Sequence, residues 1–308
     1  MSKQGKVTVL GAFVADAAFR ANRQPVMGET ILGGNFSLGP GGKGSNQAVA
    51  AARTGADVTM ITKLGKDAFA NMALQLWEDE GITPRVAQIE DSYTGAAYIF
   101  IEEGTGNNAI IVCPGAALTI TPAFIDECSE AITSADVFVT QLEQSIDAAV
   151  RALEIAKGAN VTTLFNPAPA ESVDDSIFTL CDFVTPNETE AEGFTGIKVV
   201  TVDDARKAGD ALLKKGVGTA LITLGENGAL VHGPDVSEHI PVFNAGPVVE
   251  TTGAGDAFNG GFATALARGD SPLVAARFAS AVAGLSVTRP GTAPSMPALE
   301  EVQKLLDT

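Results

Sequence analysis

The sequence predicts a single α/β domain, residues 1–308, in which a mostly parallel β-sheet is covered by helices. Stretches with helical spacing of apolar residues alternate along the chain with short β-rich runs. The runs are apolar almost throughout, which is typical of strands that are buried on both faces. Two further β-rich segments, at about 15–40 and 94–113, interrupt the alternation and predict a small β-sheet that would form a lid.

The first strand is expected at residues 6–14, with Asp16 just past its carboxyl end, where ligands collect in parallel sheets. In the small sheet, the runs 94–101 and 109–113 flank a Gly-Asn-Asn turn and predict a hairpin. Residues 29–38 are short, polar and broken by glycine, unlike the core, and we assign them to the same small sheet.

Regular alternation follows along the rest of the chain. Amphipathic helices are expected at 67–80, 122–132, 146–157 and 203–215. Strands are expected at 57–63, 136–142, 161–165, 181–185 and 219–224. A last helix at 297–306 is expected to pack on the outside.

Residues 39–47, Gly-Pro-Gly-Gly-Lys-Gly-Ser-Asn-Gln, form a glycine-rich turn before an alanine-rich helix. The glycines match the dinucleotide pattern G-x-G-x-x-G, but that pattern belongs in the first strand-to-helix turn and needs an acid after the next strand, where this chain has lysine. A Walker P-loop fails because Gly44, not Ser or Thr, follows Lys43. The turn either presents Lys43 and Asn46 to a polyhydroxy ligand or is an ordinary loop.

Residues 249–261 read as a small-residue turn that runs directly into a helix, and we place the chemistry there. Apolar residues recur at helical spacing after Asp256, and Gly269 stands where a helix usually stops. Unpaired backbone N–H groups and the helix dipole make such a start a site for an anion. Asp256 is placed to take a proton from a hydroxyl that attacks a phosphate, which favours phosphoryl transfer. The alternative is a tight turn followed by a favourable first-turn carboxylate.

The amino-acid composition argues against several kinds of binding partner. Acidic residues outnumber basic ones by 37 to 20, and the formal net charge of -17 opposes binding to nucleic acid or to an anionic membrane. Three dispersed cysteines and two histidines do not indicate a His/Cys metal cluster. Asp16 and Arg20 follow the first apolar run too soon for a signal peptide or a membrane span. We expect a cytoplasmic protein that acts on small molecules.

Polar residues follow several predicted strands. Glu143, Asn166, Asn187 and Glu190 stand at such ends, and a glycine turn at 223–228 closes another strand. Each alone is typical of a cap or a turn. Together they predict a line of ligand contacts at the carboxyl edge of the sheet.

With these motifs in place, the chain resembles the ribokinase family of sugar kinases, also called PfkB carbohydrate kinases, along nearly its whole length. The similarity lies in the segments 41–48, 141–143, 166–170, 185–190 and 252–258. The resemblance implies a ribokinase-like three-layer sandwich with a central, mostly parallel sheet and a small β-sheet lid. It also implies an ATP-dependent kinase that phosphorylates the 5-hydroxyl of D-ribose to give D-ribose 5-phosphate.

The same resemblance implies roles for individual residues. Asp256 would accept the hydroxyl proton, and the N–H groups of Gly253, Ala254 and Gly255 would stabilise the phosphoryl oxygens. Residues implied at the sugar are Val14, Asp16, Gly42, Lys43, Asn46, Glu143 and Asp256. Residues implied at ATP are Asn187, Glu190, Thr223, Gly225, Gly228, Ala254, Gly255 and Ser280. Mg²⁺ is implied beside Glu190, and K⁺ among Glu250, Thr252, Ser286, Arg289, Gly291 and Ser295. A homodimer through the lid strands is implied as well.

Two positions depart from the family's pattern. Val14 stands where ribokinases carry asparagine, so ribose loses a contact while a deoxy sugar leaves no partner unpaired. The related 2-deoxyribose kinases are apolar there too, which keeps 2-deoxy-D-ribose as the alternative substrate, although Val14 also suits ordinary strand packing. Glu250 stands where potassium-activated members carry aspartate.

Two more distant alternatives remain. A catalytically silent sugar-binding protein on the same fold is compatible with the changes at Val14 and Glu250, although the Gly-Ala-Gly-Asp run is intact. An NAD-dependent oxidoreductase is suggested only by the glycine spacing at 39–44.

Overall fold

The computed structural model describes residues 4–105 and 107–307. Residues 1–3, at the start of the stretch considered for a signal peptide, lie outside the described residues, and so does Gly106 of the predicted hairpin turn. Within the described part of the chain, no helix is both long enough and apolar enough to cross a bilayer.

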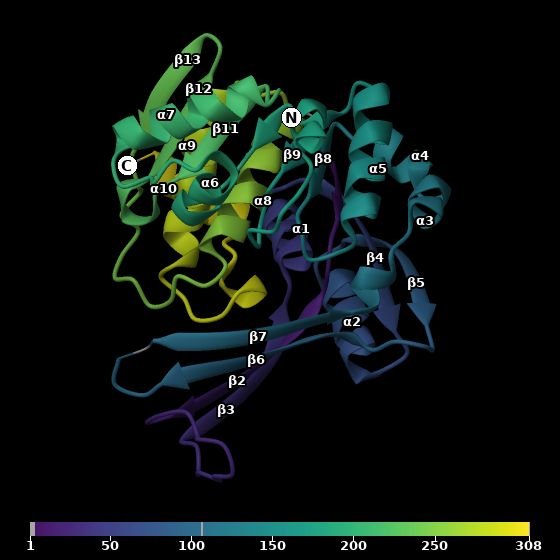
Figure 1. The fold of residues 1–308 in the computed structure, drawn as a ribbon, viewed down its shortest axis with the longest axis vertical. Helices are drawn as coiled ribbons and strands as arrows, with labels where there is room; N and C mark the ends of the chain where they lie inside the picture. The colour runs from purple at the N-terminus through teal and green to yellow at the C-terminus, as the bar shows by residue number, and fades with distance from the viewer. Residues whose placement is uncertain (1–3, 106, 308) are drawn as a thin grey trace.

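A nine-stranded sheet forms the centre of the described structure (Figure 1). Its strand order is β13-β12-β11-β10-β9-β8-β1-β4-β5, and pairing is parallel from β11 to β5 and antiparallel at β12 and β13. The strands are β1 Lys6–Leu10, β4 Asp57–Gly65, β5 Thr83–Ile89, β8 Val137–Thr140, β9 Thr162–Phe165, β10 Phe183–Val184, β11 Thr219–Thr223, β12 Ala229–Gly233 and β13 Val236–Ile240.

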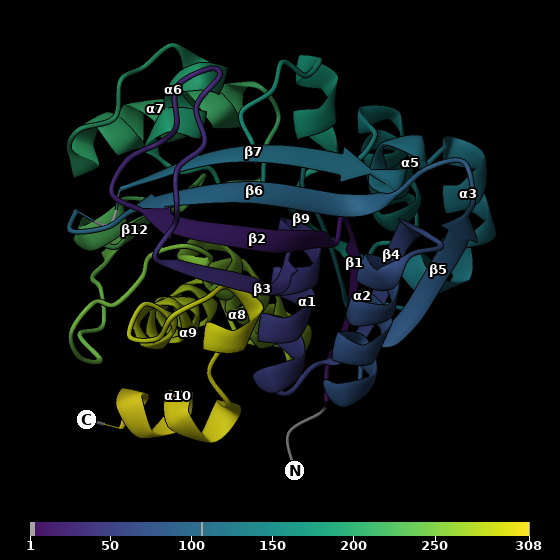
Figure 2. The same ribbon diagram turned by 90° about the horizontal axis from the view of Figure 1, so that it is seen from below.

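Helices cover both faces of this sheet, as two separate apolar clusters show. One cluster joins the sheet to α1 Lys43–Arg53, α2 Ala68–Asp79, α8 Ala254–Ala267, α9 Pro272–Ser286 and α10 Leu299–Leu306. The other joins it to α3 Pro122–Glu127, α4 Ser129–Thr133, α5 Ile146–Gly158, α6 Glu188–Thr195 and α7 Val202–Lys214. The predicted three-layer architecture is therefore confirmed, and Figure 2 shows the helices above and below the sheet.

Short 3₁₀ turns complete the described elements. They are η1 Ala116–Thr119, η2 Asp175–Leu180, η3 Gly225–Asn227 and η4 Ala293–Ser295.

A separate four-stranded sheet, which we call the lid sheet, crosses the lower edge of the molecule in Figure 1. Its strands, in the spatial order β3-β2-β6-β7, are β2 Val14–Ala21, β3 Asn35–Gly41, β6 Thr94–Glu102 and β7 Asn108–Gly115. The predicted hairpin forms as β6 and β7, and these two strands pair antiparallel. The assignment of residues 29–38 to this sheet holds only from Asn35 onward.

The prediction of one strand over residues 6–14 is wrong. The chain leaves the large sheet after Leu10 and enters the lid sheet at Val14, so Asp16 lies inside β2 instead of beyond a core strand. A Cβ atom at Gly11 would lie 2.3 Å from Gln141 Oε1 and 2.7 Å from Gly44 Cα, so only glycine fits at this crossing. Because residues 11–15 are buried throughout, hydrophobicity alone does not reveal the change of sheet.

Other predicted elements differ in smaller ways. The helix expected at 122–132 is two short helices that meet at Cys128. The antiparallel edge strands β12 and β13 were not predicted, because alternation along the chain indicates parallel neighbours only. The predicted helices at 67–80, 146–157 and 203–215 appear as α2, α5 and α7.

Candidate active site

The N-terminus of α8 is the segment in which the anion cradle is predicted. Gly253 caps the helix with a φ of 83°, a left-handed conformation that favours glycine. A Cβ atom on Gly255 would meet nothing within 4 Å, so the main chain there faces open space. The amide of Ala254 donates to the carbonyl of Thr251 at 3.1 Å, so one of the three predicted amides already has a partner.

Asp256 lies in the first turn of α8 and is 7% exposed. Its Oδ2 accepts a hydrogen bond from Asn46 Nδ2 at 2.9 Å, and its Oδ1 accepts one from Gln47 Nε2 at 3.0 Å. Burial raises the pKa of Asp256, and the Lys43 ammonium and the two amide donors oppose this rise. The carboxylate is thus held in one orientation beside the open main chain of Gly255.

Lys43 places a positive charge near three carboxyl groups, those of Asp256, Glu143 and Glu190. Burial acts to lower its pKa, but Asp256, Glu143 and Glu190 outweigh that effect and raise it. The backbone amide of Lys43 also donates to Glu143 Oε2 at 2.7 Å. Burial raises the pKa of Glu143 to about 7, against the attraction of Lys43. Lys43 and these carboxyl groups thus share one electrostatic environment.

The lid sheet brings Asp16 to the same region. Its carboxyl group lies over Gly41, where a Cβ atom would come within 2.1 Å of Oδ2. Thr292 Oγ1 lies 3.4 Å from Asp16 Oδ2 and donates to the carbonyl of Pro40 at 2.9 Å. Burial raises the pKa of Asp16 to about 6, the Thr292 contact opposes this, and Asp256 and Glu250 add to it. Asp16 therefore shares an electrostatic environment with Asp256.

Val14 lies at the base of the lid sheet, two residues before Asp16. It is 2% exposed and packs in a small apolar cluster with Ala12, Ala97 and Ala117. Gly42, which precedes α1, has a φ of 88°, and a Cβ atom there would come within 2.7 Å of the Val14 nitrogen. Val14 is therefore surrounded by apolar side chains.

Asn187 and Glu190 form a reciprocal capping box at the start of α6. Asn187 Oδ1 accepts from the Glu190 amide at 2.8 Å, and Glu190 Oε2 accepts from the Asn187 amide at 2.9 Å. Burial raises the pKa of Glu190, although Lys43 and the Asn187 amide oppose it. The box uses Oε2 of Glu190 and leaves Oε1 outside it.

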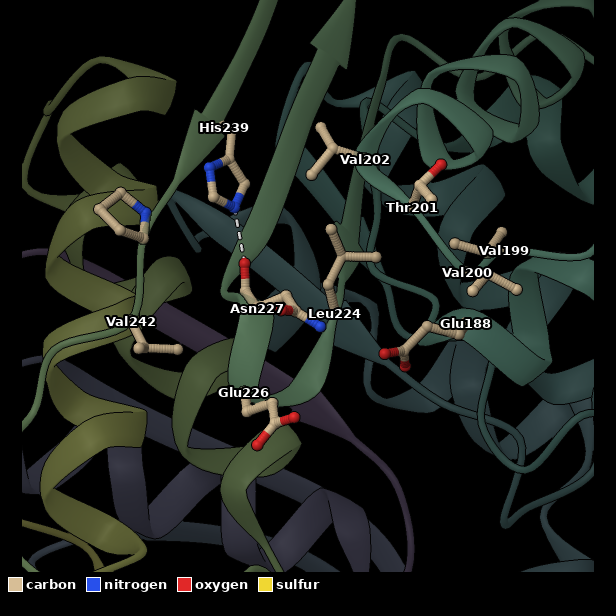
Figure 3. A pocket seen from close by; sticks show the side chains of 11 residues that line it. Glu188, Val199, Val200, Thr201, Val202, Leu224, Glu226, Asn227, His239 and Val242 are labelled. Atoms are coloured by element: carbon tan, nitrogen blue, oxygen red, sulfur yellow. Dashed lines mark hydrogen bonds between the residues drawn. The ribbon is translucent and has the colours of Figure 1, made fainter.

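A cavity of about 330 Å³ opens beside the turn between β11 and β12 (Figure 3). The predicted turn residues Gly225 and Gly228 both have positive φ, at 52° and 86°, and shape this turn. The predicted Ser280 is buried in α9. The cavity is lined by Glu188, Val199, Val200, Thr201, Val202, Leu224, Glu226, Asn227, His239, Pro241 and Val242.

Most of these lining residues were not predicted from the sequence. They come from α6, the approach to α7, the β11–β12 turn and the end of β13, which are far apart along the chain (Figure 3). His239 Nε2 lies 2.6 Å from the carbonyl of Asn227, so this side chain links β13 to the turn. Among the segments that line the cavity, only the glycine turn at 223–228 was predicted from the sequence to lie there.

Among the residues predicted for a monovalent cation, Glu250 is in contact with Gly291, in the segment that follows α9. Glu250 Oε2 accepts a hydrogen bond from the Gly291 amide at 2.9 Å. Ser295 Oγ donates to the carbonyl of Thr292 at 2.8 Å, and Ser286 Oγ donates to that of Ala283 at 2.9 Å. Carboxylate, hydroxyl and carbonyl oxygens are donors that suit a hard cation. The side chain of Glu250 thus contacts the segment that contains Gly291, and the cation site stays a prediction.

The pfkB family carbohydrate kinase profile matches residues 4–299. The chain belongs to this family of carbohydrate kinases.

Within the family, the chain is similar to two kinds of pentose kinase. It is 37% identical over 302 residues to the deoxyribokinase of Salmonella typhi, covering 97% of this chain and 98% of that protein. It is also 37% identical over 302 residues to the ribokinase of Haemophilus influenzae, covering 98% of each. The solved structure of Arabidopsis thaliana ribokinase complexed with ribose and ATP superimposes with a TM-score of 0.94 at 29% identity, covering 99% of this chain and 100% of that one.

The raised pKa of Glu143 predicts a pH dependence of stability. The folded-state pKa of about 7 exceeds the ordinary value of 4.5, so the folded protein holds a proton that the unfolded chain releases. The contribution of Glu143 to the free energy of unfolding therefore falls as pH rises from about 4.5 to about 7. Glu143→Gln removes this loss. The free energy of unfolding of the variant minus that of wild type should therefore be larger at pH 8 than at pH 5, by about 1–3 kcal/mol. Urea unfolding of both proteins at the two pH values measures the difference, and an equal difference at both would contradict the assignment.

Proposed function

We propose that this carbohydrate kinase transfers the γ-phosphoryl group of ATP to the 5-hydroxyl of D-ribose, giving D-ribose 5-phosphate. The single observation that carries the proposal is the position of Asp256, which lies directly after the open main chain at Gly255. The ribokinase complexed with ribose and ATP, whose fold matches over nearly the whole chain, supports the choice of substrates.

In the proposed reaction, Asp256 accepts the proton of the attacking hydroxyl while the new oxygen–phosphorus bond forms. The bond to the leaving ADP breaks and ADP retains the electron pair. The amides of Gly253 and Gly255 face the transferring group, where the positive end of the helix dipole stabilises its oxygens. Lys43 would neutralise part of the added negative charge.

Asp16, Lys43, Asn46 and Glu143 are proposed to hold the sugar. Asn46 Oδ1 is buried and has no hydrogen-bond partner within the described residues, so a sugar hydroxyl would satisfy it. The cavity beside the β11–β12 turn is proposed to take the nucleoside. Its valine side chains suit a base, and its Glu, Asn and Thr side chains suit the ribose hydroxyls.

Two cations are part of the proposal. Glu190 and Asn187 would hold hydrated Mg²⁺ at the phosphates, where a divalent ion neutralises phosphate charge. Glu250, with neighbouring carbonyl and hydroxyl oxygens, would hold K⁺ behind the cradle. Carboxylate, carbonyl and hydroxyl oxygens are ligands of the kind that such hard cations prefer.

The replacement Asp256→Asn tests the proposed base. An amide cannot accept the hydroxyl proton, so kcat should fall by about 10²–10⁴ while the protein stays folded. ADP release in the presence of ribose measures the rate, and circular dichroism checks the fold. Near-full kcat in Asp256→Asn would remove this residue from the role of base.

A second candidate substrate is 2-deoxy-D-ribose, because Val14 offers no hydrogen bond to a hydroxyl and the chain is similar to a deoxyribokinase. We expect ribose to be the better substrate. Paired kinetics on the two pentoses decide between them. Val14→Asn should raise kcat/KM for ribose relative to 2-deoxyribose, whereas Val14→Ala should leave the ratio unchanged. An unchanged ratio in Val14→Asn would show that position 14 does not face the sugar.

We also propose that the enzyme is a homodimer joined through the lid sheet. Phe19, Phe36 and Tyr98 form an aromatic cluster on that sheet, with ring centroids 5.0 and 5.6 Å from Phe19, and they are 42%, 55% and 37% exposed. Exposed Ile111 extends this apolar surface on β7. Apolar patches of this kind on a small sheet are typical of protein interfaces.

The dimer predicts that Phe36→Asp converts the protein to a monomer, because a carboxylate in an apolar interface loses its hydration. Sedimentation velocity measures the mass in solution. Val274→Asp on α9, at 52% exposure, is the matched control and should leave the mass unchanged. A wild-type protein that sediments as a monomer would refute the dimer.

A further inference from the structure

The two amides that bind Asp256 stand next to each other in α1, but they have different surroundings. Asn46 gives one hydrogen bond to Asp256 Oδ2, and its own carbonyl oxygen is buried without a partner in the described part of the chain. Gln47 is 1% exposed and uses both ends of its side chain within the protein. Asn46 therefore has capacity for a ligand, whereas Gln47 is committed to the protein itself.

The contacts of Gln47 fix the orientation of its amide. Gln47 Oε1 accepts a hydrogen bond from Gln141 Nε2 at 2.6 Å. Gln47 Nε2 then faces two acceptors, Asp256 Oδ1 and Asn166 Oδ1, each at 3.0 Å. An amide in the opposite orientation would place its oxygen against two other oxygens. The neighbours of Gln47 thus ensure that a donor, not an acceptor, meets the carboxylate.

The hydrogen bonds continue from Asn166 and return to α8. Asn166 Nδ2 donates to the carbonyl of Thr185 at 2.9 Å, and Thr185 Oγ1 donates to Asn259 Oδ1 at 2.6 Å. Asn259 Nδ2 donates to the carbonyl of Gly255 at 2.8 Å. The series thus begins at the carboxylate of Asp256 and ends at the residue before it, after passing the carboxyl ends of β9 and β10.

We propose that Gln47 is a positioning residue for the reaction, which holds Asp256 Oδ1 and leaves Oδ2 as the oxygen that receives the hydroxyl proton. Oδ1 accepts a hydrogen bond from the buried amide of Gln47, which is committed to protein partners. Oδ2 lies on the side of Asn46, whose carbonyl oxygen has no partner in the described part of the chain. This inference rests on the proposed kinase function of Asp256.

A donor at Oδ1 also favours the ionised form of Asp256, which is the form that can accept a proton. The other charged groups that face Asp256 are Lys43 of α1, Glu143 after β8, Asp16 of β2 and Glu190 of α6. Three of these four are carboxyl groups, which disfavour the anion. Loss of the Gln47 donor should therefore make Asp256 harder to ionise.

The test compares Gln47→Met with Gln144→Met. Gln144 is buried to the same degree, at 2% exposure, but its amide donates to Thr140 Oγ1 and to the carbonyl of Gln141, away from Asp256. Methionine keeps the length of the side chain in both variants and removes the donor. In Gln47→Met, the acid limb of the kcat/KM profile for ribose should move up by about 1–2 pH units, and kcat should fall about tenfold. In Gln144→Met, the acid limb should stay where wild type has it.

A second measurement needs no substrate. Titration of the Asp256 carboxyl carbon by NMR should give a higher pKa in Gln47→Met than in wild type or Gln144→Met, whatever sugar the enzyme uses. The NMR titration therefore tests the role of Gln47 independently of the choice of ribose. If the wild-type enzyme is inactive on ribose, only the proposed substrate is refuted. If Gln47→Met does not fold, Gln141→Met removes the bond that orients Gln47 and should shift the same pKa upward by a smaller amount. An unchanged Asp256 pKa in the folded variant, or an equal shift in Gln144→Met, would overturn the role of Gln47.

Discussion

The structure depends on keeping one carboxylate buried and oriented at the start of α8. Burial of a charged group is costly unless hydrogen bonds and an opposite charge replace its water. Asp256 receives two amide donors from α1, the charge of Lys43 and the positive end of its own helix. These groups come from α1 and α8, which lie side by side on one face of the large sheet (Figure 2). The packing of this helix pair therefore determines the geometry of the site.

Small residues make that packing possible. A Cβ atom at Gly260 of α8 would come within 2.5 Å of Ala50 of α1, and one at Gly44 would come within 2.7 Å of Gly11. The backbones of α1, α8 and the crossing between the two sheets thus approach more closely than larger side chains allow. The close approach brings the amides of Asn46 and Gln47 within hydrogen-bond distance of Asp256. Gly44, one of the glycines that match the dinucleotide pattern in the sequence, thus acts here as a packing residue.

The lid sheet joins the rest of the protein through short polar contacts near Asp256. Thr292 lies between Pro40 and Asp16 on the lid side and Gly253 on the cradle side, where a Cβ atom would lie 3.3 Å from Thr292 Cα. Glu250 accepts a hydrogen bond from the amide of Gly291, next to Thr292 in the sequence. Thr292 was not predicted, because a threonine among prolines and glycines has no spacing that distinguishes it from a loop residue. Asp16 and Ala254, the first residue of α8, are 238 residues apart along the chain, and only folding brings them together at Thr292.

The sequence by itself determined the α/β class, the position of most helices, and Asp256 with its glycine turn, because periodicity and helix-start signals are local properties of the chain. The motif residues Lys43, Asn46, Glu143 and Glu190 could also be singled out, since each follows a strand or a glycine turn. Only the tertiary structure decided that Asp16 belongs to the lid sheet, that Val14 packs among alanines, and that Gln47 meets Asp256. These facts depend on which segments pack together, and hydrophobic spacing does not specify partners that are distant in sequence.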